Sequence, residues 1–454
     1  MPLIHKFKIH DTYMVIDVNS GAVHEIDEIS YHVLDYYPKH SLKDTIELLN
    51  KRYSATEISQ VIEEIDILIK EKMLYSDNFC EEDNLQKLNM DQVIKAMCLH
   101  VAHDCNIRCK YCFASQGDFR GQRLMMPLEV GKRAIDFLIE NSGSRRNLEI
   151  DFFGGEPLMN FDVVKKIIQY ARDQEESTNK RFRFTITTNA TLLTEETMRY
   201  INAHMDNIVL SIDGMKSTND LMRPTINGKG TYDIILPKIK RMVEKRGCRS
   251  HYVRGTFTKY NLDFAKDVLH LSDLGFKEIS VEPVVAEADK DYAITKEDLA
   301  TIFDEYEKLA IEYINRKNTE KEFNFFHFIV DLKQGPCVHK RLSGCGAGNE
   351  YVAITPEGDI YPCHQFVGNE LFIMGNVIDG IVQPEIREDF KNAHVLNKEK
   401  CSDCWAKFYC SGGCHANAYN FNRDISIPYE VGCEMEKKRL ECALMIQAHL
   451  MEGI

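Results

Sequence analysis

The stretch Cys105-Asn-Ile-Arg-Cys109-Lys-Tyr-Cys112-Phe113 is the most informative part of the chain. Three and then two residues separate its cysteines, a spacing that lets one short loop wrap around a single metal cluster. Thiolates are the usual ligands of iron–sulfur clusters, and a cubane has four irons. Three cysteines therefore leave one iron open to a substrate or cofactor. The alternatives are a zinc site and a ferredoxin-like site that lacks its fourth ligand.

Composition indicates a cytoplasmic protein with metal chemistry. The chain has 15 cysteines in 454 residues and a formal net charge of −14. No run of about 18 apolar residues could span a membrane, and the first residues, MPLIHKFKIH, lack the apolar core of a signal peptide. Disulfides are rare in a reducing cytosol, so metal or redox chemistry is the better interpretation of the cysteines. Neither a nucleic acid, which so acidic a chain would repel, nor a membrane is an expected partner.

Residues 93–320 alternate between strand-like and helical patterns. The strand-like runs are KAMCLHVA, LEIDFFG, RFTITTN, NIVLSID, HYVRGTFT and EISVEPVV. Helical stretches such as LEVGKRAIDFLIEN and VVKKIIQYARDQ lie between them. Six such β/α units predict an α/β fold with a parallel sheet, either open or curled into a partial (β/α)6 barrel. The cysteine triad follows the first strand, where active groups of parallel α/β folds are found.

Residues 1–77 show a different pattern. Three strand-like runs, KFKIHDT, YMVIDV and AVHEI, precede helical stretches that begin near Ile29, Ser41 and Ser54. Three strands and three helices predict a winged-helix-like module. Many such modules bind DNA, but this one has 8 Lys/Arg against 14 Asp/Glu, which favours a peptide or protein partner. Residues 78–92 are predicted to be an acidic linker.

Residues 321–454 contain the second group of cysteines. Cys345 is followed by twelve residues, Gly358, four residues and Cys363, and the later cysteines are Cys401, Cys404, Cys410, Cys414 and Cys433. A zinc ribbon is the simpler alternative, but zinc sites take four ligands each, and seven cysteines fit two sites poorly. Seven cysteines suit two cubanes with one iron unassigned.

The triad and its surroundings resemble the radical S-adenosylmethionine (SAM) superfamily. Tyr111 before the last cysteine matches its signature, and Gly154-Gly155-Glu156-Pro157, one β/α unit later, matches its GGEP element. The resemblance implies a [4Fe–4S] cluster on Cys105, Cys109 and Cys112 whose free iron binds SAM. It also implies a set of SAM-binding residues: Tyr111, Gly155, Glu156 at the ammonium group, Ser211 at the ribose, Arg223 at the carboxylate and Val284 at the adenine.

The C-terminal cysteine spacing resembles the SPASM domain of radical SAM enzymes that modify peptides and proteins. The resemblance assigns Cys345, Cys363 and Cys414 to an inner auxiliary cluster. It assigns Cys401, Cys404, Cys410 and Cys433 to an outer one, which makes three [4Fe–4S] clusters in all. Cys337 either completes the inner cluster or leaves that iron open for a substrate thiolate; the seven-cysteine pattern, complete without it, slightly favours the open iron.

Over its whole length the chain resembles radical SAM/SPASM maturases of ribosomally made peptides. The N-terminal module looks like their recognition element, in which a leader peptide adds as a strand beside Ala22 to Ile26 and against the helix Ile58 to Lys70. The chain most resembles the maturases of SCIFF peptides, small cysteine-rich peptides that receive thioether crosslinks. The implied activity joins cysteine sulfur to carbon in a precursor peptide through a 5′-deoxyadenosyl radical, with an external one-electron reductant.

Two other functions fit part of the pattern. An anaerobic sulfatase-maturating type of enzyme, which oxidises cysteine or serine to formylglycine, shares the barrel and the clusters but has no need of the N-terminal module. An iron–sulfur electron carrier explains the cysteines but leaves GGEP and the open-iron triad unexplained. The sequence names no catalytic base.

Overall fold

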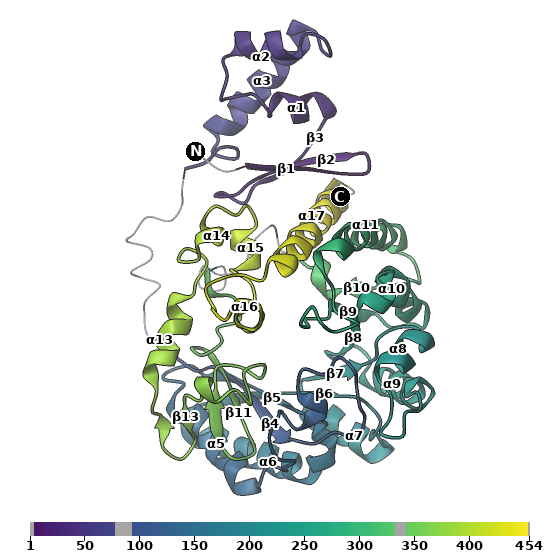
Figure 1. Ribbon diagram of the computed structural model, residues 1–454, viewed down its shortest axis with the longest axis vertical. Coiled ribbons are helices and arrows are strands. Elements are labelled where there is room, and N and C mark those ends of the chain that lie inside the picture. Colours follow the sequence, from purple (N-terminus) through teal and green to yellow (C-terminus); the bar gives the residue numbers. More distant parts are fainter. Residues whose placement is uncertain (1–3, 78–92, 331, 333–341, 453–454) are drawn as a thin grey trace.

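The computed structural model describes residues 4–77, 93–330, 332 and 342–452. The predicted linker at 78–92 and Cys337 lie outside the described residues. The strands form two sheets, one of three strands and one of eleven. Figure 1 shows the small sheet near one end of the long axis and the large sheet following an arc through the rest of the molecule.

The N-terminal module contains the three strands and three helices that the sequence predicts. They are β1 (Ile4–Ile9), β2 (Thr12–Asp17), β3 (Val23–Ile26), α1 (Glu28–Val33), α2 (Leu42–Leu49) and α3 (Ala55–Lys70). The strands pair antiparallel in the order β1-β2-β3. Ser54 begins α3 with a capping box, because its side chain accepts from the Glu57 N–H while the Glu57 side chain accepts from the Ser54 N–H. The buried face of α3 consists of Ile58, Val61, Ile62 and Ile65.

The large sheet contains the six predicted parallel strands, each paired with the next. They are β4 (Ala96–Ala102), β5 (Asn147–Gly154), β6 (Arg181–Thr188), β7 (Asn207–Ser211), β8 (Tyr252–Phe257) and β9 (Glu278–Pro283). The helices along the outside of the arc are α5 (Leu128–Glu140), α6 (Phe161–Thr178), α7 (Glu195–His204), α8 (Lys216–Met222), α9 (Tyr232–Arg246), α10 (Phe264–Asp273) and α11 (Leu299–Arg316) (Figure 1). The predicted α/β fold with a curled parallel sheet is confirmed.

The C-terminal region extends this sheet, which the sequence analysis did not foresee. β10 (Asn324–Phe325) pairs with β9 at one edge, and β11 (Tyr351–Ile354) runs parallel to β4 at the other. The strands β12 (Asp359–Tyr361), β13 (Gly375–Asn376) and β14 (Gly380–Ile381) follow antiparallel. The predicted boundary at residue 320 therefore falls between strands of one sheet, and the division into domains stays a prediction.

The helices of the C-terminal region are mostly short. They are α13 (Pro384–Asn392), α14 (Glu399–Ser402), α15 (Lys407–Cys410), α16 (His415–Asn422) and α17 (Glu430–Glu452). Single 3-10 turns complete the fold: η1 (Ser115–Gly117), η2 (Pro157–Asn160), η3 (Lys259–Asn261), η4 (Lys296–Asp298), η5 (Phe326–Phe328) and η6 (Glu370–Phe372). Among the described helices, none combines the length and the apolar character needed to cross a bilayer.

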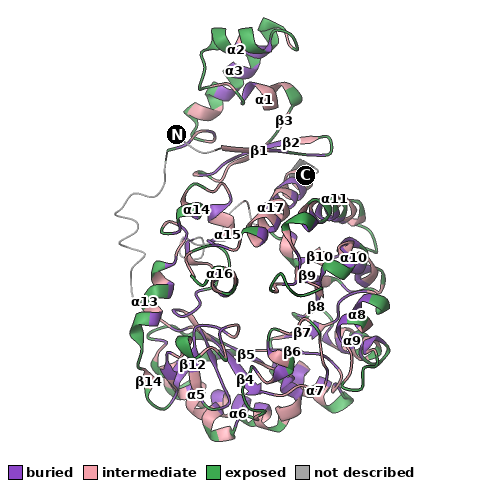
Figure 2. Cartoon of the chain, in the orientation of Figure 1, coloured by how far each residue is buried: buried purple, intermediate pink, exposed green. Residues whose placement is uncertain are grey.

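Each barrel strand presents one face to the helices and one to the interior of the arc. In β6, Phe182, Phe184 and Ile186 are at most 1% exposed, whereas Thr187 lines a cavity. Figure 2 shows buried residues gathered where strands and helices meet. Strands covered on both faces are usually continuous apolar runs. On the interior face these strands also carry polar residues, because that face borders the cavity and is not covered by a second apolar layer.

The sheet of the N-terminal module packs on the C-terminal region. The His5 ring of β1 stacks on Trp405, with ring centroids 4.0 Å apart and 3° between the planes. His5 Nε2 also lies 2.9 Å from Glu441 Oε1 of α17. Trp405 follows Cys404 directly and is the single tryptophan of the chain. The module is therefore in contact with the loop that carries one of the predicted outer-cluster cysteines.

Candidate active site

The three triad thiols, Cys105, Cys109 and Cys112, line one cavity of about 460 Å³ at the carboxyl ends of the barrel strands. The described cysteines are free thiols. Within the described ranges, no three His, Cys, Asp or Glu side chains converge on a point that would hold a single metal ion. The triad faces a shared space that is also lined by residues from several other strands.

Close packing between β5 and the cysteine loop explains the two glycines of GGEP. A Cβ at Gly155 would lie 2.1 Å from the carbonyl oxygen of Asp104, and one at Gly154 would lie 2.2 Å from that of Ala102. The Gly155 N–H donates to Ala102 O at 2.8 Å, and the Glu156 N–H donates to Asp104 O at 2.9 Å. From the sequence, these glycines were predicted to let the backbone approach the methionine part of SAM. In the structure, Gly154 is needed for the close approach to the end of β4, and Gly155 for the close approach to the cysteine loop.

A second segment, far away in sequence, also fixes the cysteine loop. The Arg108 N–H donates to Pro224 O at 2.8 Å, and the Lys110 N–H donates to Met222 O at 2.9 Å. These bonds surround Arg223, the residue predicted to bind the SAM carboxylate. The fold therefore ties this arginine to the triad through the backbone.

Arg223 belongs to a buried polar unit with Tyr111 and Asp213. Arg223 Nη1 donates to the Tyr111 hydroxyl at 3.0 Å, and that hydroxyl lies 2.8 Å from each Asp213 carboxylate oxygen. Burial raises the pKa of Asp213 to about 6, although Arg223 opposes this. Among the described residues, Arg223 Nε has no hydrogen-bond partner. Asp213 was not among the predicted site residues; its only signal in the sequence is its place at the end of the NIVLSID run.

Glu156 is buried and does not line the cavity. Its carboxylate accepts from the Thr188 hydroxyl at 2.7 Å, the Asn189 N–H at 2.8 Å and the Leu158 N–H at 3.0 Å. Burial raises its pKa to about 7. Asn189, also missed in the sequence, has Nδ2 3.7 Å from Cys105 Sγ. Glu156 thus supports the loop that reaches the triad, while its predicted contact with the SAM ammonium group stays a prediction.

The other predicted SAM residues do meet at the cavity. Tyr111, Gly155, Ser211, Arg223 and Val284 all line it together with the triad. The lining also includes polar residues that the sequence analysis did not name: Asn189, Arg254, Thr256, Glu282, His364 and Asn417. Asn189 and Glu282 lie near strand ends, which was visible in the sequence, but which side chains face the cavity was not.

The residues present fit SAM on a [4Fe–4S] cluster. Three thiols are the donor set that such a cluster takes, and cavities of this volume hold small-molecule cofactors. Arg223, with its unpaired Nε, suits the bidentate recognition of a carboxylate. Burial raises the pKa of Cys105 to about 11 and that of Cys109 to about 12. Metal coordination is what would hold such buried thiols as thiolates.

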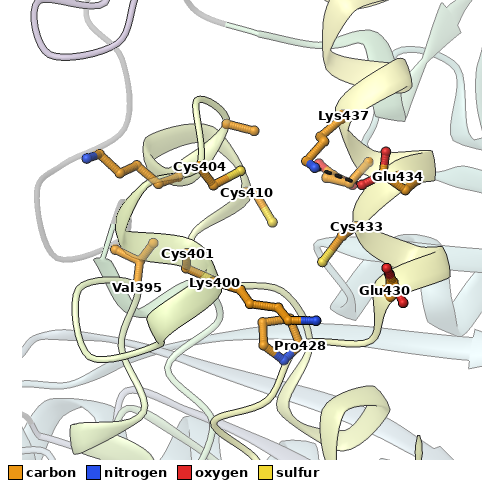
Figure 3. A pocket seen from close by; sticks show the side chains of 14 residues that line it. Val395, Lys400, Cys401, Cys404, Cys410, Pro428, Glu430, Cys433, Glu434 and Lys437 are labelled. Atoms are coloured by element: carbon orange, nitrogen blue, oxygen red, sulfur yellow. Dashed lines mark hydrogen bonds and ion pairs between the residues drawn. The ribbon is translucent and has the colours of Figure 1, made fainter. Parts of the chain in front are cut away.

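The four cysteines assigned to the outer cluster surround a second cavity, of about 310 Å³. Cys401, Cys404 and Cys410 come from the α14–α15 region, and Cys433 comes from α17 on the opposite side (Figure 3). The lining also contains three lysines, Lys400, Lys407 and Lys437, and three glutamates, Glu430, Glu434 and Glu436, so its charges balance. The grouping of the four thiols fits the predicted ligand set, which remains a prediction.

The inner set lies close to the active cavity. Burial is the main cause that raises the pKa of Cys363, and the thiols of Cys414 and Cys345 raise it as well. The three thiols are therefore neighbours. Cys414 itself lines the cavity that contains the triad. Whether Cys337 completes this set stays open, because it lies outside the described residues.

Comparison with known families identifies two regions of the chain. Residues 99–268 match the radical SAM superfamily, and residues 345–405 match the SPASM iron–sulfur cluster-binding domain. The solved structure of SuiB from Streptococcus suis bound to S-adenosylmethionine aligns with a TM-score of 0.54 at 19% identity, covering 94% of this chain and 98% of that one. The fold is therefore the radical SAM α/β fold with a SPASM domain.

Two curated relatives are similar in sequence. The radical SAM cyclopropyl synthase TigE of Paramaledivibacter caminithermalis is 23% identical over 426 residues, covering 87% of this chain and 84% of TigE. The serine-type anaerobic sulfatase-maturating enzyme of Klebsiella aerogenes is 23% identical over 340 residues, covering 70% of this chain and 79% of that enzyme. The TigE and SuiB alignments cover 87% and 94% of the chain, which is more than the part from residue 93 to residue 454 alone. Both alignments therefore include part of the N-terminal module.

Proposed function

We propose that this radical SAM enzyme installs thioether crosslinks, from cysteine sulfur to carbon, in a ribosomally made cysteine-rich precursor peptide. The proposed setting is the cytoplasm, with an external one-electron reductant. The observation that carries the proposal is the shared cavity. Triad residues, predicted SAM-binding residues and Cys414 of the inner set line one space, so a peptide in it would meet both sites.

The cluster and SAM, when bound, supply a 5′-deoxyadenosyl radical that takes a hydrogen atom from a substrate carbon. The side chains of the protein bind and orient. Arg223, held by Tyr111 and Asp213, suits the SAM carboxylate. Ser211 and Val284 line the same cavity, and we assign them to the ribose and the adenine. Next to them, an open inner iron near Cys414 would hold a substrate thiolate beside the carbon to be joined.

The N-terminal module supports a leader-guided substrate. Among the described strands, only β2 pairs with β3, so one edge of β3 offers main-chain groups to an added strand. His24 Nε2 of β3 lies 3.2 Å from Met73 O, just beyond α3, which fixes the strand relative to the end of that helix. Our proposal places the leader along β3 and against α3. The alignment with SuiB also includes part of the N-terminal module, and SuiB has been solved bound to the precursor peptide SuiA.

Mass spectrometry tests the proposed reaction. The probe is a synthetic peptide made from the cysteine-rich reading frame nearest the gene, incubated anaerobically with reconstituted enzyme, SAM and dithionite. A thioether removes two hydrogens per crosslink and leaves fewer thiols to alkylate. A free aldehyde that reacts with a hydrazine reagent would instead identify formylglycine, the product of the sulfatase-maturating alternative.

A further inference from the structure

A salt bridge inside the cavity plays no part in the SAM contacts proposed above. Arg254 of β8 and Glu282 of β9 both line the cavity, and Arg254 Nη2 donates to Glu282 Oε2 at 2.6 Å. Their side chains are 44% and 35% exposed, so both charged groups face open space. Of the described residues that line this cavity, Glu282 is the only one with a carboxylate.

The pair lies between the predicted SAM position and the inner cysteine set. Arg254 is in register with Ser211, the predicted ribose contact, on the neighbouring strand. On the other side, His364 lines the same cavity as the pair. His364 follows Cys363 directly. A substrate that reaches from SAM to the inner set therefore passes the pair.

Residues behind Glu282 fix its position. His327 Nε2 lies 3.8 Å from Glu282 Oε1 and 3.2 Å from Ser280 Oγ. On its other side, Arg439 of α17 donates from Nη1 to His327 Nδ1 at 3.0 Å. A guanidinium only donates, so Nδ1 is the acceptor and Nε2 carries the ring proton toward Ser280 and Glu282. Burial, and then Arg439, lower the pKa of His327 to about 3, which keeps the ring neutral.

These charges suit Glu282 to binding better than to proton transfer. Burial raises the pKa of Glu282, but the charge and the hydrogen bond of Arg254, with Arg439 also lowering it, leave the pKa below its ordinary value. A general base works best with a pKa near the working pH. A thiol has an ordinary pKa of about 8.5, so this carboxylate, whose pKa lies below the usual range of a glutamate, is too weak a base to take its proton efficiently. Glu282 is instead a permanent anion with a guanidinium beside it.

We propose that Arg254 and Glu282 form a clamp that binds one peptide unit of the substrate backbone and so positions the residue to be modified. The clamp rests on the proposed function, because its ligand is the peptide of that reaction. A carboxylate and a guanidinium side by side offer an acceptor for a peptide N–H and a donor for a peptide C=O. Backbone recognition leaves the substrate side chain free to approach the radical. A primary-carbon radical is unselective, so this positioning decides which hydrogen is taken.

Coupling between SAM cleavage and peptide modification tests the clamp. The holoenzyme is assayed with SAM, dithionite and the synthetic peptide described above, for Glu282→Gln and Arg254→Lys. The control, Glu140→Gln, breaks the exposed Arg133–Glu140 pair (2.9 Å) on α5, outside the cavity. Iron content and SAM affinity are measured for each variant, since a variant that misfolds loses both.

Glu282→Gln is expected to keep SAM affinity and 5′-deoxyadenosine production within about threefold of wild type. Its yield of modified peptide falls about 10- to 100-fold, the range for removing a charged hydrogen-bonding group. Arg254→Lys keeps the positive charge but not the planar pair of guanidinium donors, so its yield of modified peptide falls by less. Glu140→Gln is expected to keep the wild-type yield. The measured signature is a rise in 5′-deoxyadenosine formed per modified peptide.

Two results would overturn the clamp while the proposed function stands. Unchanged peptide modification in Glu282→Gln would show that the pair does not hold substrate. A parallel loss of SAM affinity and SAM cleavage would assign the pair to the SAM site. By contrast, a wild-type enzyme that neither binds nor modifies the peptide refutes the proposed function, and the clamp with it.

Discussion

Replacing Gly155 by alanine is expected to remove the triad cluster and leave the auxiliary clusters in place. The added Cβ would lie 2.1 Å from the Asp104 carbonyl oxygen, 2.5 Å from its carbon and 3.1 Å from the Cys105 Cβ. Ordinary contact begins at 3.4 Å, so β5 and the cysteine loop must separate by more than 1 Å. Overpacking of this kind costs about 1–3 kcal/mol, and here its relief displaces Cys105.

The assay is anaerobic iron and sulfide analysis combined with SAM cleavage. Three cubanes correspond to about twelve irons per chain, and loss of one leaves about eight. Gly155→Ala is expected near eight irons, with no 5′-deoxyadenosine formed. Gly121→Ala is the matched control, because its Cβ would meet only Asp118 O, at 3.5 Å. A Gly155→Ala protein with twelve irons and wild-type SAM cleavage would refute the argument that this glycine is needed for the approach of β5.

Three further predictions concern the triad, the N-terminal module and the contact between that module and the C-terminal region. Cys105→Ala abolishes SAM cleavage with the auxiliary clusters intact, and continued 5′-deoxyadenosine formation would contradict the assignment. Asp17→Asn weakens hydrogen-exchange protection of the Ser20 and Ser76 amides at pH 7 by about 1–3 kcal/mol, because those groups donate to the Asp17 carboxylate. Burial raises the pKa of Asp17, but the hydrogen bonds from Ser20 and Ser76 lower it by more, so the folded pKa lies below the unfolded value of about 3.9. The stabilisation by Asp17 is therefore fully present above the unfolded pKa and is lost as the pH falls through the folded pKa. His5→Ala removes the ring stacked on Trp405 and should shift the emission of this single tryptophan, whereas an unchanged spectrum would mean that the module does not dock there in solution.

Much of the fold followed from local pattern. Apolar runs placed β4 to β9 within a few residues, and Ser54 marked the start of α3 because a capping box involves only neighbouring residues. The extension of the sheet by β10 to β14 was missed. Strands of two to four residues carry too little periodicity to be recognised, and their pairing depends on partners far away in the chain.

The candidate site divides in the same way. The triad was predicted from its spacing, since three thiols in one short loop can share a cluster. The seven later cysteines were predicted from their resemblance to the SPASM pattern. Asp213, Asn189 and Glu282 gave no such signal. Each is a common residue near the end of a strand, and its importance comes from the side chains that other strands bring beside it.

The spacing of the triad by itself predicted a cluster with an open iron, because three thiols within eight residues need no tertiary contact to meet. Tertiary structure alone decided what surrounds the triad. It brought Arg223 to Tyr111, the thiol of Cys414 to the cavity of the triad, and Arg254 to Glu282 between them. Those contacts join segments far apart in sequence, and only the curled sheet sets the distances between them.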